Sequence, residues 1–140
     1  MIPFIDLQAQ RARIADKIDA AVSKVIRHGA YIFGPEVKQF EAELAAFAQA
    51  KHAIGNANGT DALVLPLWAW GIGEGDAVFT PSFTFAATAE IVPWTNATPV
   101  FVDVLPDTYN VDPKSLEAAI AGIKKDGKLK PKAVIAVDLF

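Results

Sequence analysis

Apolar residues recur at helical spacing in the first third of the chain. Between residues 7 and 27 they return about every fourth position, with polar residues on the opposite face. This pattern predicts one amphipathic helix over residues 7–27. A loop bounded by Gly29 and Gly34 follows. A second helix with a single apolar stripe is predicted to begin at Pro35, because proline is well accommodated in a first turn.

Short apolar runs alternate with helical stretches in the rest of the chain. Strands are predicted at residues 53–57, 77–80, 99–104 and 133–139. Helices are predicted at residues 62–70, 82–94 and from Asp112-Pro113 to about Gly122, and residues 124–132 are predicted to form a solvated basic loop. Strands that alternate with helices indicate an α/β fold with a mostly parallel sheet flanked by helices. Pro66 and Pro93 fall inside predicted helices, so distortion is expected there.

Composition narrows the class of protein. The chain has 140 residues, 52% hydrophobic and 21% charged, which is typical of one globular domain. A net charge of −3 gives no reason to expect binding to nucleic acid or to an anionic membrane. No apolar run approaches the roughly 20 residues that span a bilayer. The absence of cysteine fits a cytoplasmic protein. Residues 133–139 resemble a buried strand, so we expect further chain after them.

Candidate chemistry gathers at the predicted strand ends, where ligands of α/β sheets bind. Asn58-Gly59-Thr60-Asp61 lies between a predicted strand and a helix. Glycine permits close approach of a ligand, and a helix N-terminus favours a phosphate. The alternative is a simple helix cap, since Asn, Thr and Asp are all capping residues, and spacing alone favours the cap.

A second strand end carries two phenylalanines, Phe83 and Phe85. An aromatic ring there can offer a flat face to a planar cofactor, whereas Phe83 is predicted to pack in the core. Asp103 and Asp138 also follow strands and could face a ligand, although Asp103 equally suits the start of a turn. The histidines have no metal-ligating companions at useful spacing and receive no catalytic role.

Several motifs, taken in order, resemble one family. They are Ile5-Asp6-Leu7, Gly34-Pro35-Glu36-Val37, Asn58-Gly59-Thr60-Asp61-Ala62-Leu63, Gly71-Ile72-Gly73-Glu74-Gly75-Asp76, Thr80-Pro81-Ser82-Phe83-Thr84-Phe85, Ala97-Thr98-Pro99-Val100-Phe101-Val102-Asp103, Asp107-Thr108-Tyr109-Asn110 and Asp112-Pro113. The chain resembles the DegT/DnrJ/EryC1/StrS sugar aminotransferases over essentially its whole length. The resemblance implies a fold-type-I transferase that depends on pyridoxal 5'-phosphate, and residues 1–140 would be the N-terminal segment of its large domain.

The resemblance also implies roles for particular residues. The turn that holds the cofactor phosphate corresponds to Gly59, Thr60 and Asp61. Phe85 corresponds to the aromatic residue that stacks on the pyridine ring. Tyr31 and Phe33 correspond to a loop near the active-site entrance and are expected to contact substrate.

The reaction implied is transfer of an amino group from an amino acid, glutamate in most members, to a keto group of a nucleotide-linked sugar. The family members act as homodimers. Their catalytic lysine and the acid that pairs with the pyridine nitrogen correspond to positions after residue 140, and Asp138 precedes that acid by a βα unit. The 140 residues alone are therefore expected to be inactive. The alternatives are a non-catalytic binding or assembly module, a sugar dehydratase of the same superfamily, and a Rossmann-type domain, although no dinucleotide fingerprint is present.

Overall fold

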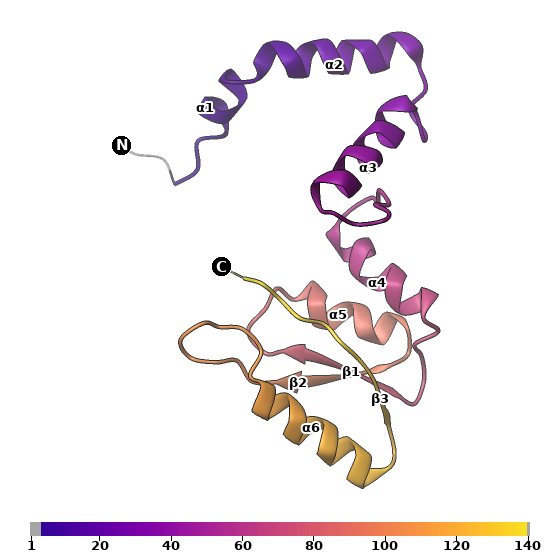
Figure 1. Ribbon diagram of the computed structural model, residues 1–140, viewed down its shortest axis with the longest axis vertical. Coiled ribbons are helices and arrows are strands. Elements are labelled where there is room, and N and C mark those ends of the chain that lie inside the picture. Colours follow the sequence, from indigo (N-terminus) through magenta and orange to yellow (C-terminus); the bar gives the residue numbers. More distant parts are fainter. Residues whose placement is uncertain (1–3, 140) are drawn as a thin grey trace. The chain divides into compact units, whose positions relative to one another are not determined.

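The computed structural model describes residues 4–139 of the chain. It consists of two compact units, which we call the N-terminal unit (Met1–Gly55) and the sheet unit (Asn56–Phe140). The order of elements follows the colours of Figure 1. The N-terminal unit contains α1 (Leu7–Ala12), α2 (Ala15–His28) and α3 (Pro35–Phe47). The sheet unit contains α4 (Gly59–Ala69), β1 (Asp76–Pro81), α5 (Ala87–Trp94), β2 (Thr98–Val102), α6 (Pro113–Asp126) and β3 (Lys130–Val134).

The prediction of one helix over residues 7–27 is wrong, because the chain turns between α1 and α2. The N–H groups of Arg13 and Ile14 bond to the carbonyls three residues earlier, and Ile14 has a non-helical φ of −131°. Asp6 caps α1, since its carboxylate accepts a hydrogen bond from the Ala9 N–H at 2.9 Å. The apolar periodicity continues across the turn, which explains why the pattern concealed it.

The loop between α2 and α3 begins and ends at glycines that have distinct functions. Gly29 ends α2 in the left-handed region at φ 69°, where glycine is unstrained. Gly34 precedes α3, and a Cβ atom there would clash with the carbonyl oxygen of Ala30. The prediction that α3 begins at Pro35 is confirmed.

The sheet of the described chain has three parallel strands in the order β2-β1-β3. All six residues of β1 are buried, since this strand lies between the other two. Helix α5 connects β1 to β2, and α6 connects β2 to β3. The predicted α/β class with a parallel sheet is confirmed. The predicted strand at residues 53–57 is wrong, because this stretch has no assigned strand and Ile54 is 79% exposed.

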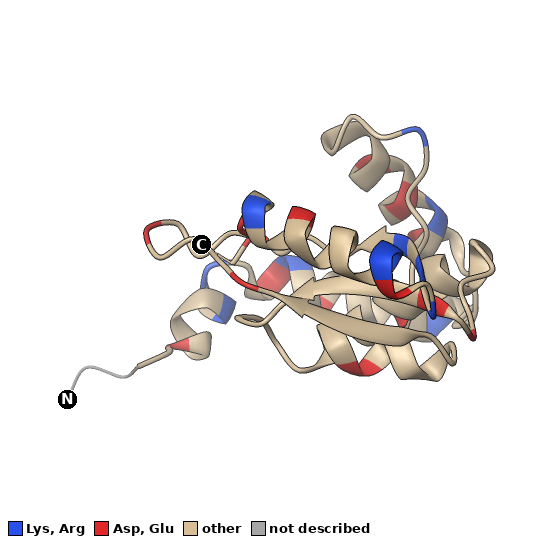
Figure 2. Ribbon diagram, turned by 90° about the horizontal axis from the view of Figure 1, so that it is seen from below, with Lys and Arg blue, Asp and Glu red and all other residues tan. Residues whose placement is uncertain are grey.

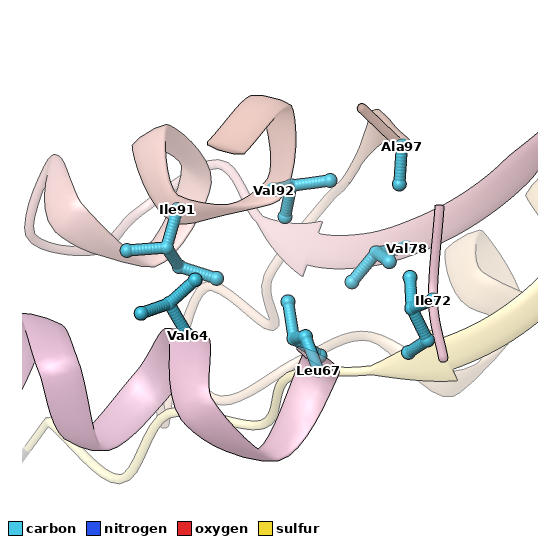
Figure 3. Packing of buried hydrophobic residues seen from close by; sticks show 7 residues of the cluster. All are labelled: Val64, Leu67, Ile72, Val78, Ile91, Val92 and Ala97. Atoms are coloured by element: carbon cyan, nitrogen blue, oxygen red, sulfur yellow. The ribbon is translucent and has the colours of Figure 1, made fainter. Parts of the chain in front are cut away.

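Alternate side chains of β1 pack into two cores, one on each face of the sheet. Val78 packs with Val64 and Leu67 of α4 and with Ile91 and Val92 of α5, as Figure 3 shows. On the other face Ala77, Phe79 and Val102 pack against the apolar residues of α6. The period-two alternation of a strand therefore places helices on both faces, as predicted.

Several helix and strand boundaries differ from the predicted ones. Helix α4 begins at Gly59 rather than residue 62, and it continues through Pro66. Helix α5 begins at Ala87 rather than residue 82, and Pro93 falls in its last turn. The predicted basic loop at residues 124–132 is instead the end of α6, a left-handed cap at Gly127 and the start of β3. The predicted strand at residues 133–139 begins earlier, at Lys130, and ends at Val134, after which the Ile135 N–H still donates to the Phe79 carbonyl of β1 at 2.8 Å.

Charged residues are distributed along the helices. Acidic and basic residues are interspersed along the ribbon in Figure 2. Helix α6 carries Lys124 and Lys125 in its last turn, where the helix dipole favours positive charge. Within residues 4–139, no helix has the length and apolar character needed to cross a membrane. No group of three or more potential metal ligands occurs in the same residues.

Candidate cofactor cleft

The N-terminus of α4 is capped by Asn58, which confirms the capping interpretation of this motif. Asn58 has an extended backbone, and its Oδ1 accepts a hydrogen bond from the Asp61 N–H at 2.9 Å. Its Nδ2 donates in return to the Asp61 carboxylate at 3.2 Å. The N–H groups of Gly59 and Thr60 precede the first intrahelical hydrogen bond, so they can still donate hydrogen bonds to an anion. Capping and anion binding are therefore compatible here.

Gly59 leaves open space at this helix end. A Cβ atom at Gly59 would meet no heavy atom within 4 Å, and the residue is exposed. A ligand can consequently approach the backbone closely, which is the property that phosphate sites at helix N-termini require. Thr60 follows and is partly buried. It adds a hydroxyl group to the same turn.

A cleft of about 460 Å³ lies beside this turn. It is bordered by the start of α4, by the segment 84–88 and by the chain after β3. Its lining residues are Gly59, Thr60, Leu63, Thr84, Phe85, Ala87, Thr88, Val137 and Leu139. The structure thus brings together Gly59, Thr60 and Phe85, three of the residues predicted to hold the cofactor. No lysine is among the described residues that line the cleft.

Phe85 lies on the segment between β1 and α5 and is 75% exposed. Next to it, the hydroxyl groups of Thr84 and Thr88 are hydrogen-bonded at 2.8 Å. Thr88 is 5% exposed, on the buried side of α5. The sequence argument missed this pair, although the four-residue spacing of the two threonines within a predicted helix was an available indication.

Asp61 is not among the cleft-lining residues. Its carboxylate accepts a hydrogen bond from Asn58, as described above, and this contact orders the turn. A direct role for Asp61 in cofactor binding stays a prediction.

The prediction that Phe83 packs in the core is wrong. The residue is 46% exposed, and its ring lies against Tyr109 with centroids 5.3 Å apart at 38°. The physical reason is that β1 ends at Pro81, so Phe83 has already left the buried sheet.

The two aspartates at later strand ends have different surroundings. Asp103 belongs to a turn, because its Oδ1 accepts from the Val104 N–H and its own N–H donates to the Ser115 hydroxyl, each at 2.9 Å. The turn alternative is therefore confirmed for Asp103. Asp138 stands between the cleft-lining Val137 and Leu139 but is itself outside the lining.

Tyr31 and Phe33 belong to the N-terminal unit, and both are exposed, at 66% and 77%. The Tyr31 hydroxyl donates to the Ile26 carbonyl at 3.5 Å. Phe33 has a φ of 49°, in the left-handed region that bulky residues rarely adopt. Their predicted contact with substrate stays a prediction.

A charged cluster joins α2 to α3 beside that loop. Glu36 contacts Lys24 Nζ at 3.0 Å and His28 Nε2 at 3.1 Å. The Lys24 ammonium is the main cause that lowers the pKa of Glu36 from its ordinary 4.5 to about 2, and a backbone hydrogen bond and the His28 ring add to the effect. His28 Nδ1 accepts from the Ala30 N–H at 3.0 Å. The neutral ring therefore carries its proton on Nε2 and donates it to Glu36.

A parallel α/β sheet with an open helix N-terminus and an exposed aromatic ring beside one cleft is the arrangement of an α/β ligand-binding domain. The similar solved structures described below are fold-type-I transferases. Comparison with the sequences of known families identifies the family within this class. Residues 12–140 match the DegT/DnrJ/EryC1/StrS aminotransferase family. The chain belongs to this family, whose aminotransferases use pyridoxal 5'-phosphate.

Individual relatives agree with this assignment. The chain is 54% identical over its whole length to the UDP-2-acetamido-2-deoxy-3-oxo-D-glucuronate aminotransferase of Pseudomonas aeruginosa, of which it covers 37%. It is 40% identical over its whole length to the dTDP-3-amino-3,6-dideoxy-alpha-D-galactopyranose transaminase of Aneurinibacillus thermoaerophilus, again covering 37%. The chain thus spans little more than a third of the length of these relatives.

Solved structures share the fold. A DegT DnrJ EryC1 StrS aminotransferase from Brucella abortus superposes with a TM-score of 0.97 at 58% identity, over 99% of this chain and 37% of that one. NtdA from Bacillus subtilis, solved with bound cofactor PMP, superposes with a TM-score of 0.80 at 26% identity, over 94% of this chain and 36% of that one. The fold-type-I prediction is therefore confirmed.

Proposed function

We propose that the protein to which this chain belongs is an aminotransferase that moves an amino group from an amino acid, glutamate in the first instance, to a keto group of a nucleotide-linked sugar. The observation that carries the proposal is the convergence of Gly59, Thr60 and Phe85 on one cleft in a chain of this family. The relatives support the substrate class, because two of them are named for UDP-linked and dTDP-linked sugars.

The residues present fit pyridoxal 5'-phosphate. The free N–H groups of Gly59 and Thr60 and the Thr60 hydroxyl would bind its phosphate at the positive end of α4. The open space at Gly59 admits the phosphate without a clash. Phe85, largely exposed and lining the same cleft, would lie against the pyridine ring.

Each part of the cleft has a separate task. When bound, the cofactor supplies an electron sink for the amino transfer. Leu63, Ala87, Val137 and Leu139 give the cleft apolar walls that exclude water from the ring. The proton-transferring lysine and the acid that pairs with the pyridine nitrogen are expected outside these 140 residues.

We further infer that the active form is a cytoplasmic homodimer. Support for the dimer comes from the exposed apolar residues Tyr31, Ile32 and Phe33, which form a surface that another part of the protein or a second subunit can cover. Light scattering on the full-length protein tests this inference. An active species with the mass of one subunit would contradict it.

The activity is tested with the full-length protein, pyridoxal 5'-phosphate, ¹⁵N-glutamate and a panel of UDP- and dTDP-linked keto sugars. Mass spectrometry should find ¹⁵N in one sugar product and 2-oxoglutarate in equal amount. Loss of a hydroxyl group from the sugar without incorporation of nitrogen would indicate the dehydratase alternative. Failure to bind any member of the panel would favour a non-catalytic module.

A further inference from the structure

The segment that presents Phe85 has no regular secondary structure and is fastened at both ends. At its start the Ser82 N–H donates to the Val102 carbonyl of β2 at 2.9 Å. At its end the Thr88 N–H donates to the Phe85 carbonyl at 3.0 Å as α5 begins. In the described part of the chain, the side-chain hydrogen bond that ties the middle of this segment to a buried element is the 2.8 Å contact between Thr84 and Thr88.

The two threonines differ in how firmly the fold holds them. Thr88 is 5% exposed, and its neighbours on α5, Ala87 and Ile91, are equally buried. Thr84 is only partly buried and lies one residue before Phe85. Thr88 is therefore the fixed partner, and Thr84 is the partner whose position depends on the bond.

Phe85 itself has little packing to fix its direction. Three quarters of its surface is exposed, so the ring gains little from contacts within the chain. The direction of its Cα–Cβ bond is set by its backbone, which is continuous with Thr84. A rotation of this backbone would turn the ring away from Gly59 and Thr60, which line the same cleft.

We propose that Thr88 is a positioning residue: through its hydroxyl bond to Thr84 it holds the 82–86 segment in the conformation that aims the Phe85 ring into the cleft. The inference rests on the proposed function for the identity of the ligand, while the ordering of the segment is independent of it. Thr88 acts through Thr84 and Phe85 and need not touch the cofactor.

The test begins with hydrogen exchange on the full-length apoprotein. Thr88→Val removes the hydroxyl and keeps the shape of the side chain, whereas Thr88→Ser keeps the hydroxyl. We expect faster exchange of the amides of residues 83–86 in Thr88→Val and exchange close to wild type in Thr88→Ser. Thr84→Val removes the same hydrogen bond at the less buried partner. It replaces Thr88→Val in the experiment if that variant fails to fold. Unchanged exchange in a folded valine variant would overturn the inference.

The second measurement distinguishes an effect on the Phe85 ring from an effect on the phosphate site. Because one net hydrogen bond is lost, Thr88→Val should weaken the binding of pyridoxal 5'-phosphate about three- to tenfold. The affinity of the apoprotein for inorganic phosphate should stay unchanged. Thr60→Val should weaken both probes. Equal weakening of both probes by Thr88→Val, or unchanged affinity for pyridoxal 5'-phosphate despite faster exchange, would contradict the positioning role. If the wild-type protein bound no pyridoxal 5'-phosphate, the proposed function would fail, and the exchange data would still decide whether Thr88 orders the segment.

Discussion

The two units of the chain bury their apolar residues to very different extents. In the sheet unit every residue of β1 is buried, and helices from both sides close over it. In the described part of the N-terminal unit, Gly34 alone is buried, although α2 and α3 are amphipathic. Ile26, Phe40 and Phe47 are 62%, 57% and 87% exposed. Apolar residues thus form a core in one unit and exposed stripes in the other.

The difference shows that an amphipathic helix does not make a core by itself. A sheet offers two faces, and each strand side chain meets several neighbours on adjacent strands and helices. The N-terminal unit is held by local contacts, such as the Arg11–Asp19 and Lys24–Glu36 ion pairs at 3.1 and 3.0 Å. Exposed pairs of this kind contribute little to stability. Substitutions should therefore have large effects in the sheet unit and small ones in the N-terminal unit.

The largest expected effect comes from Phe79→Ala. Phe79 is 1% exposed under α6, so its loss should lower the free energy of unfolding by about 3–5 kcal/mol. Phe47→Ala, at a residue 87% exposed, should change it by less than about 0.5 kcal/mol. Denaturant unfolding of the full-length variants measures both values. A comparable loss at Phe47 would show that α3 is packed in the complete protein. It would contradict the difference in burial between the two units.

The next largest effect concerns the cleft rather than the core. Thr60→Val should weaken the binding of pyridoxal 5'-phosphate by about 1.5–3 kcal/mol, the usual value of a hydrogen bond to a charged group. Thr98→Val, at an exposed position on β2, is the matched control and should leave the affinity unchanged. Titration of the apoprotein, followed by the absorbance of the cofactor, gives the dissociation constants. Equal affinities in wild type and Thr60→Val would show that the Thr60 hydroxyl does not bind the phosphate.

Gly34→Ala tests a close backbone contact in the N-terminal unit. The added Cβ would clash with the Ala30 carbonyl, so a loss of about 1–3 kcal/mol is expected. Gly122→Ala lies on α6 in open space and should instead stabilise by about 0.5–1 kcal/mol. Thermal unfolding compares the two variants. If Gly34→Ala were neutral, the loop before α3 would have to relax freely.

The smallest effect is the pH dependence contributed by Glu36. Its folded-state pKa of about 2 lies below its ordinary 4.5, so its contribution is fully present above pH 4.5 and is lost as the pH falls from 4.5 toward 2. Glu36→Gln should remove this part of the pH dependence of unfolding. Glu117→Gln, at an exposed position on α6, provides the comparison. The same slope for wild type and Glu36→Gln between pH 2 and 4.5 would contradict the assigned role of Lys24.

The local order of the chain was determined by its sequence. The period of apolar residues predicted an α/β fold with parallel strands, and Pro35 and Asp112-Pro113 marked two helix starts, because these features depend on neighbouring residues alone. The Asn58-Gly59-Thr60 turn could be found in the same way, since a cap and an open helix end are local chemistry.

Only the tertiary structure decided which residues meet. Strand order and the placement of Phe85 and Gly59 in one cleft depend on chain crossings that no local pattern encodes. The apolar character of Phe83 favoured a core position, although the buried sheet ends with β1, and periodicity passed over the turn at Ile14. Both errors arise because apolarity does not show whether a partner surface is present. Burial is a property of two surfaces, and a sequence window describes only one of them.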